Sequence, residues 1–335
     1  MAKATKLKDT DYLYASARIK SLEKNLLTRE RLERMSEARS PEDAAKLLSE
    51  SGWPEIASLT MAALEEVLSS RRSEAFALVH SLAPDKRLTD VFFMKYDYHN
   101  LKALLKAEAT GENAEGLEID SGRFPVRQLR MMLQDGSFAA MSKPMADSVA
   151  EARDVLARTQ DPQLLDLILD KAMYVDMLET AESFGVQFLI GYVKLVIDSV
   201  NLRVAVRLRR MGKGADALRY ALVPGGSVSA SRLLGDITPD TIEAVFNTSP
   251  LAGAAQAGAQ ALRGEASLSD VDMACDDTLL KYLRNAKYVA FGAEPLIGYL
   301  AAVEAELTSV RTVITGRLAG LAAEMITERL RETYV

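Results

Sequence analysis

Apolar residues recur along most of this chain at steps of three and four, which is the spacing of one face of an α-helix. Residues 12–26, 61–82 and 296–314 show the pattern over their whole length, and each predicts a helix with one buried face. Arg71 interrupts the second stripe once. No comparable stretch alternates apolar and polar residues with the period of two that a half-buried strand requires. The pattern therefore predicts an all-α protein.

Four prolines mark the expected starts of helices. Each follows a residue whose side-chain oxygen can cap free backbone amides, and proline at the first helical position loses no hydrogen bond. The pairs are Ser40-Pro41, Asp161-Pro162, Thr238-Pro239 and Ser249-Pro250. The segments 111–122 and 224–231, rich in glycine and serine, are interpreted as loops between helical units.

Internal repetition is the most informative feature of the sequence. Phe184-Gly185 followed by Leu189-Ile190-Gly191-Tyr192 recurs, 107 positions later (184 to 291), as Phe291-Gly292 and Leu296-Ile297-Gly298-Tyr299. A weaker first copy precedes them, because Asp97, Asn100, Leu101 and Lys102 are echoed 101 positions later (97 to 198) by Asp198, Asn201, Leu202 and Arg203. We therefore expect three helical units, at residues 1–115, 116–222 and 223–335.

The repeated polar residues have two interpretations. Asp97 and Asn100 lie one turn apart and share a helix face, and Asp198 and Asn201 repeat the arrangement. Polar groups on an apolar helix usually hydrogen-bond to neighbouring segments of the same protein. Alternatively, these groups line a surface that contacts a partner.

Composition and charge exclude several classes of function. Hydrophobic residues make up 48% and charged residues 26%, as in a packed globular protein, and the net charge of −6 offers no field for nucleic acid. The basic residues 207–213 end a predicted helix, where cations complement its dipole. A single cysteine, Cys275, allows no internal disulfide. The most apolar stretch, 186–197, is too short to cross a membrane and contains Lys194.

No catalytic, metal or cofactor site is expected. The two histidines, His80 and His99, have no second metal ligand near them in sequence, and the Gly212-Lys213-Gly214 segment lacks the other residues of a phosphate-binding loop. An acidic cluster precedes a predicted helix, and carboxylates at a helix N-terminus are favoured by the helix dipole. It comprises Asp270, Asp272, Asp276 and Asp277.

Two separated segments of the chain resemble signatures of one family. Residues 93–102 (Phe-Met-Lys-Tyr-Asp-Tyr-His-Asn-Leu-Lys) are similar to a hallmark of the C subunit of archaeal and bacterial A/V-type ATPases, whose eukaryotic counterpart is the d subunit. Residues 294–300 (Glu-Pro-Leu-Ile-Gly-Tyr-Leu) resemble the other signature, which continues through Glu304, Glu306, Arg311, Gly316, Gly320 and 328–330. Residues 14–19 also fit, whereas 113–165 match weakly and Thr308-Ser309 stands where an asparagine is expected.

The resemblance implies three similar helical bundles around a pseudo-threefold axis, forming a funnel. In that family the funnel couples an axle made of the D and F subunits to the proteolipid rotor ring in the membrane. It implies a non-catalytic central-stalk component that binds no nucleotide and works as a cytoplasmic, peripheral part of an ATP-linked proton or sodium transporter. The candidate network or partner-contact residues are Asp97, Asn100, Lys102, Asp198, Asn201, Arg203, Glu304, Glu306 and Arg311.

Two alternatives remain beside this interpretation. The repeat alone is also typical of a helical scaffold that binds some other protein partner, in which case we expect an open solenoid. An all-helical enzyme that uses the acidic cluster around Asp276 is the other alternative, although no further catalytic residue supports it.

Overall fold

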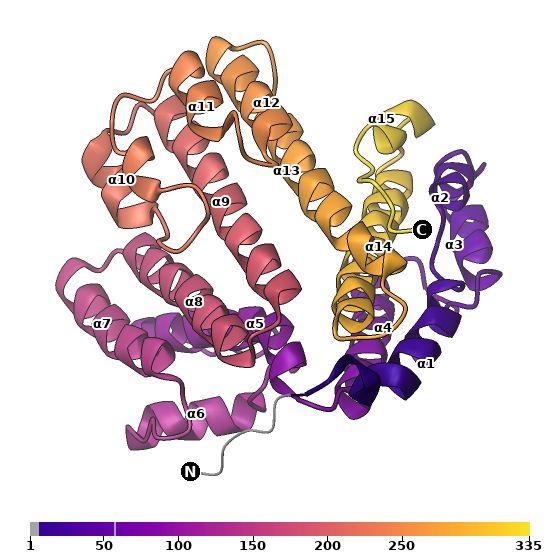
Figure 1. Cartoon of the computed structure of the whole chain (residues 1–335), viewed down its shortest axis with the longest axis horizontal. Coiled ribbons are helices and arrows are strands. Elements are labelled where there is room, and N and C mark those ends of the chain that lie inside the picture. The colour runs from indigo at the N-terminus through magenta and orange to yellow at the C-terminus, as the bar shows by residue number, and fades with distance from the viewer. Residues whose placement is uncertain (1–6, 57) are drawn as a thin grey trace. The chain divides into compact units, whose positions relative to one another are not determined.

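The computed structural model describes residues 7–56 and 58–335, and the regular elements in these two ranges are all helical (Figure 1). The all-α prediction is thereby confirmed. The α-helices are α1 (Leu13–Glu23), α2 (Arg29–Ser36), α3 (Pro41–Ser49), α4 (Met61–Leu82), α5 (Arg87–Thr110), α6 (Val126–Asp135), α7 (Lys143–Thr159), α8 (Pro162–Phe184), α9 (Gln187–Arg210), α10 (Ala215–Ala221), α11 (Pro239–Phe246), α12 (Ala252–Arg263), α13 (Leu268–Leu283), α14 (Glu294–Leu318) and α15 (Ala323–Thr327). Short 3-10 helices are η1 (Asp9–Tyr12), η2 (Ala230–Leu233) and η3 (Arg284–Tyr288).

The chain folds into two compact units, of which the first is built from both ends of the sequence. It contains the described residues up to Thr89 and those from Cys275 onward. Its centre is α14, which packs against α1, α2, α3, α4 and α15. The apolar face of α14 is fully buried, with Leu296, Leu300 and Val303 at 0% exposure, so α14 organises this unit.

The second unit is formed by residues 90–274. Helices α7 and α8 form an antiparallel hairpin, α9 packs on α8, and α12 packs on α9 (Figure 1). The predicted three-unit division concerns repetition in the sequence, whereas the two units reflect packing. The three units at 1–115, 116–222 and 223–335 therefore stay a prediction.

The helices predicted from the apolar stripes agree with the structure apart from the end of the first one. The stripes at 61–82 and 296–314 correspond to α4 and α14. The helix predicted over 12–26 ends at Glu23, because the chain turns there and buries Leu26 in the turn. Among the described residues, no helix has both the length and the apolar character that a bilayer-spanning segment needs.

Three of the four proline-marked starts are helix starts with a side-chain cap. Ser40, Asp161 and Thr238 accept hydrogen bonds from backbone amides at the beginnings of α3, α8 and α11. The fourth prediction is wrong by two residues, since α12 begins at Ala252 rather than Pro250. Ser249 instead accepts from the Leu251 amide at 2.9 Å and stabilises the turn that precedes the helix.

Candidate functional site

The repeated polar residues of α5 bind the loop that follows that helix. Asn100 donates from Nδ2 to the Ile119 carbonyl and accepts from the Ile119 amide, both at 2.8 Å. Asp97 accepts from the Phe124 amide at 3.2 Å. Both side chains are buried, at 0% exposure. We call this arrangement, Asp97 and Asn100 with loop residues 119–124, the α5 clasp.

The corresponding residues of α9 make the same contacts with their own loop. Asn201 donates to the Val223 carbonyl and accepts from the Val223 amide, again at 2.8 Å in both directions. Asp198 accepts from the amides of Ser227 and Val228, each at 3.0 Å. This is the α9 clasp, formed by Asp198 and Asn201 with residues 223–228. Two stretches that are similar in sequence therefore have the same structural role.

A glycine in each loop allows the close approach of backbone and carboxylate. A Cβ atom on Gly122 would clash with Oδ1 of Asp97, and a Cβ on Gly226 would clash with Oδ1 of Asp198. Any other residue would have to displace the carboxylate or the loop. These glycines are the sequence signal for the clasps, because each lies in a loop predicted from its glycine content.

The two clasps differ in their counterion. Nε of Arg123 donates to Asp97 Oδ2 at 2.7 Å, and the guanidinium also reaches Asp176 at 3.3 Å. Asp176 accepts in addition from the hydroxyls of Ser142 (2.7 Å) and Tyr98 (3.3 Å). Burial raises the pKa of Asp97, and the Arg123 charge opposes that increase. This buried network joins α5, α8 and the start of α7, and sequence reasoning missed Arg123 and Asp176.

Asp198 has no cation in contact with it among the described residues, and it accepts from backbone amides instead. Burial raises the pKa of Asp198 to about 6, and the two amide hydrogen bonds only partly oppose this. Its side chain is 1% exposed. An ionised carboxylate without a counterion is costly in such a place.

The third copy of the sequence pattern lies on α14 and is built differently. Glu306 accepts from the Leu27 amide at 2.7 Å, and Arg71 lies 3.6 Å from its other oxygen. Burial raises the pKa of Glu306. Ser309, at the position of the expected asparagine, donates to the Ala305 carbonyl of its own helix. The loop bound by α14 therefore comes from the beginning of the chain, which explains why spacing within the repeat did not reveal it.

The basic residues at the repeated positions each pair with a carboxylate on another helix. Lys102 of α5 binds Asp170 of α8, and Arg203 of α9 binds Asp272 of α13 at 3.4 Å. Arg311 of α14 binds both oxygens of Glu65 on α4, at 2.7 and 2.6 Å. A fourth pair joins Glu304 to Arg72 at 3.2 Å. The nine sequence-predicted residues thus form separate clasps and bridges rather than one cluster.

The acidic cluster lies within α13 rather than before a helix, and two of its four members hold the end of the chain. Arg331 donates to Asp276 at 2.9 Å, and the Glu332 amide donates to Asp277 at 2.8 Å. His99 contacts the Leu117 carbonyl at 2.8 Å. Within the part of the chain that the structure describes, no group of three or more His, Cys, Asp or Glu side chains could hold a metal ion. The contacts of these residues are those of a folded scaffold.

A profile of the family described as "ATP synthase (C/AC39) subunit" matches residues 15–329. The chain belongs to this family. The C subunit of the V-type sodium ATPase from Enterococcus hirae is 26% identical over 272 residues, covering 81% of this chain and 82% of the relative. The C subunit of the A-type ATP synthase from Methanocaldococcus jannaschii is 24% identical over 339 residues, covering 94% and 85%.

A third relative is more similar over a shorter stretch. The C subunit of the V-type ATP synthase from Thermus thermophilus is 31% identical over 131 residues, which are 38% of this chain and 41% of the relative. Membership in this family makes the chain a structural, non-catalytic component of a membrane-associated rotary ATPase. The recognition from two short signatures is confirmed, and other components of that complex are its partners.

Proposed function

We propose that this chain is the central-stalk socket that couples an axle made of the D and F subunits to the proteolipid rotor ring. In this role it transmits torque between ATP chemistry and proton or sodium movement, and it binds no nucleotide itself. It works at the cytoplasmic face of the membrane as a peripheral component. The three helical units then surround a pseudo-threefold axis and form a funnel.

The observation that carries the proposal is the order of the bridges between helices. In sequence order, the second helix of each repeat (α5, α9, α14) is bridged to the first helix of another repeat (α8, α13, α4). The last of these bridges returns from the third repeat to the first. A closed cycle of this kind is what three units around an axis need, whereas an open solenoid has no such return.

The clasps suit a part that works under torque. Each fixes the loop after a long helix through buried hydrogen bonds, and close-packed interiors resist deformation. We propose that the residues of the clasps and bridges keep the socket rigid. Arg311 has the most exposed side chain of the nine residues, at 41%, and is the best placed of them to meet a partner.

A binding experiment tests the coupling role. The full chain, immobilised through a tag, is expected to retain a folded complex of the D and F subunits, and the purified chain alone is expected to hydrolyse no ATP. Failure to retain that complex, with circular dichroism showing both partners folded, would reject the axle contact.

Small-angle scattering of the free chain tests the alternative of an open helical scaffold. A compact, funnel-shaped envelope supports the socket, whereas an extended, curved envelope supports a scaffold for some other protein. The two experiments are independent, so a folded funnel that fails to bind the axle would reject the partner without rejecting the architecture.

A further inference from the structure

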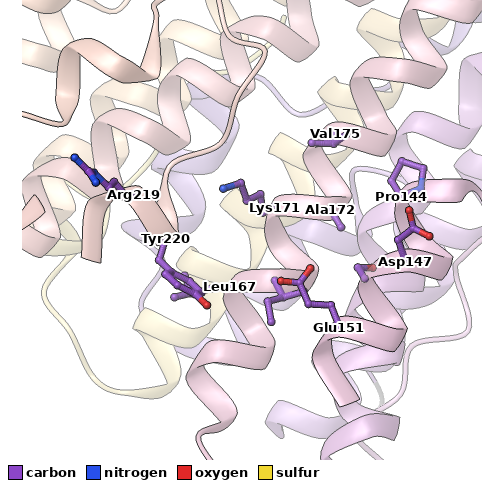
Figure 2. A pocket seen from close by; sticks show the side chains of 11 residues that line it. Pro144, Asp147, Glu151, Leu167, Lys171, Ala172, Val175, Arg219 and Tyr220 are labelled. Carbon is purple, nitrogen blue, oxygen red and sulfur yellow. The ribbon is translucent and has the colours of Figure 1, made fainter. Parts of the chain in front are cut away.

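A groove on the second unit lies between the α7–α8 hairpin and α10, and none of the residues that line it belongs to a clasp or a bridge (Figure 2). It has a volume of about 380 Å³. Its floor is largely apolar, formed by Leu167, Ile168, Ala172 and Val175 of α8 with Pro144 of α7. Apolar surface that is left open between helices commonly marks a binding site.

One side of the groove is cationic. Lys171 extends from α8 toward the side on which Arg219 and Tyr220 of α10 lie (Figure 2). Tyr220 is 52% exposed although it is large and aromatic. Within residues 7–56 and 58–335, neither Lys171 nor Arg219 takes part in an ion pair. Two cations and an aromatic ring are therefore available to an incoming group.

The opposite side carries carboxylates. Asp147 and Glu151 lie one turn apart on α7 and line the groove (Figure 2). Asp147 pairs with Lys143 of its own helix, and both side chains of that pair are largely exposed. Glu151 forms no ion pair in the described part of the chain. The groove therefore presents positive charge along one side and negative charge along the other.

This division of charge selects the class of partner. A nucleic acid or an anionic membrane would be attracted by Lys171 and Arg219 but repelled by Asp147 and Glu151. An amphipathic helix satisfies both sides at once, since its apolar stripe covers the floor and its two polar edges carry opposite charges. Complementary charge of this kind fixes the register of a partner more than it adds affinity.

We propose that the groove between α7, α8 and α10 is a docking site for a helical segment of another protein, with acidic residues on one edge of its apolar stripe and basic residues on the other. Its acidic edge faces Lys171 and Arg219, and its basic edge faces Asp147 and Glu151. An apolar side chain from its stripe packs against the ring of Tyr220. The proposal does not rest on the axle and ring contacts.

Three synthetic 18-residue helical peptides test the proposal with the full chain. All share a Leu/Ala stripe; the first has Glu on one edge and Lys on the other, the second has Lys on both edges, and the third has Glu on both. Fluorescence anisotropy should show that the mixed peptide binds most tightly. The double variant Lys171→Glu/Arg219→Glu should weaken that binding by about tenfold and should come to prefer the peptide with Lys on both edges.

The matched control reverses two exposed cations outside the groove, in the double variant Lys46→Glu/Arg127→Glu on α3 and α6, and should bind like the parent chain. All four substituted residues form no ion pair in the described part of the chain, so unchanged circular dichroism is expected for both variants. Equal binding of the three peptides, no binding of any, or full retention by the groove variant would overturn the proposal. Charge-reversal-sensitive binding to phosphatidylglycerol vesicles or duplex DNA, without peptide binding, would assign the groove to a polyanion and overturn it as well.

Discussion

Asp97 and Asp198 show how one residue type is used with and without a counterion. Both are buried on long helices and both accept hydrogen bonds from loop amides, but only Asp97 has an arginine against it. Arg123 in turn serves Asp176, so two buried carboxylates share one guanidinium. The stability of the α5 clasp therefore depends on Arg123 more than on any exposed ion pair.

Arg123→Leu should lower the free energy of unfolding by about 3–5 kcal/mol, because removing one partner leaves buried charges uncompensated. Urea denaturation followed by circular dichroism measures the loss. Arg158→Leu is the control, because Arg158 and Asp154 form an exposed pair on α7 that should contribute less than about 1 kcal/mol. Similar losses in the two variants would contradict the assigned role of Arg123.

Asp198 should make stability depend on pH. Its pKa is about 6 in the folded chain and 3.8 when it is unperturbed, so the native state holds the proton more tightly. Linkage then requires the contribution of Asp198 to stability to increase as pH falls from above 6 toward 3.8, by about 2 kcal/mol. The Asp198→Asn variant cannot titrate at this position. The free energy of unfolding of the parent chain minus that of the variant should therefore increase by about 2 kcal/mol as the pH falls from 7.5 to 4.5.

A parent-minus-Asp198→Asn difference that decreases on acidification would show that the ionised form is favoured in the fold. That result would contradict the effect of burial described for this carboxylate.

Long helices bound to the loops that follow them are the common element of the second unit. Periodicity and proline caps predicted α4, α14 and the beginnings of α3, α8 and α11, because those signals are local. Hydrogen bonding of Asp97, Asn100, Asp198 and Asn201 within the protein was one of two interpretations of the sequence, but their partners were not predicted, since the atoms they bind belong to the backbone of the loops. Glu306 binds Leu27, a residue near the other end of the chain, and no local pattern could predict that contact.

Gly226→Ala should destabilise the chain by about 1–3 kcal/mol, since the added methyl group overlaps Asp198 and forces the loop out of its clasp. Differential scanning calorimetry should show a lower Tm. Gly235→Ala lies in an open loop with nothing within 4 Å of the new Cβ, and it should leave Tm nearly unchanged. Equal Tm values for the two variants would mean that the α9 clasp tolerates a displaced loop.

The whole molecule combines a unit of contiguous sequence with a unit made from both ends of the chain. A fragment of residues 84–286 should fold alone, with a helical circular dichroism spectrum and a cooperative thermal transition, because it contains the complete second unit. A fragment of residues 1–89 should not fold, since α14 supplies the apolar surface on which α1–α4 pack. A cooperative transition for the short fragment would contradict the central role of α14.

The division of the first unit between the chain ends has a consequence for biosynthesis. Helices α1–α4 leave the ribosome first, but α14 follows only after all of residues 90–274 have been translated. At elongation rates of roughly 5–20 residues per second, their apolar faces stay uncovered for on the order of ten seconds or more. During this time the second unit can fold, whereas the first unit stays incomplete until α14 is synthesised. We therefore expect chaperones that bind emerging helices to bind the nascent chain until translation ends.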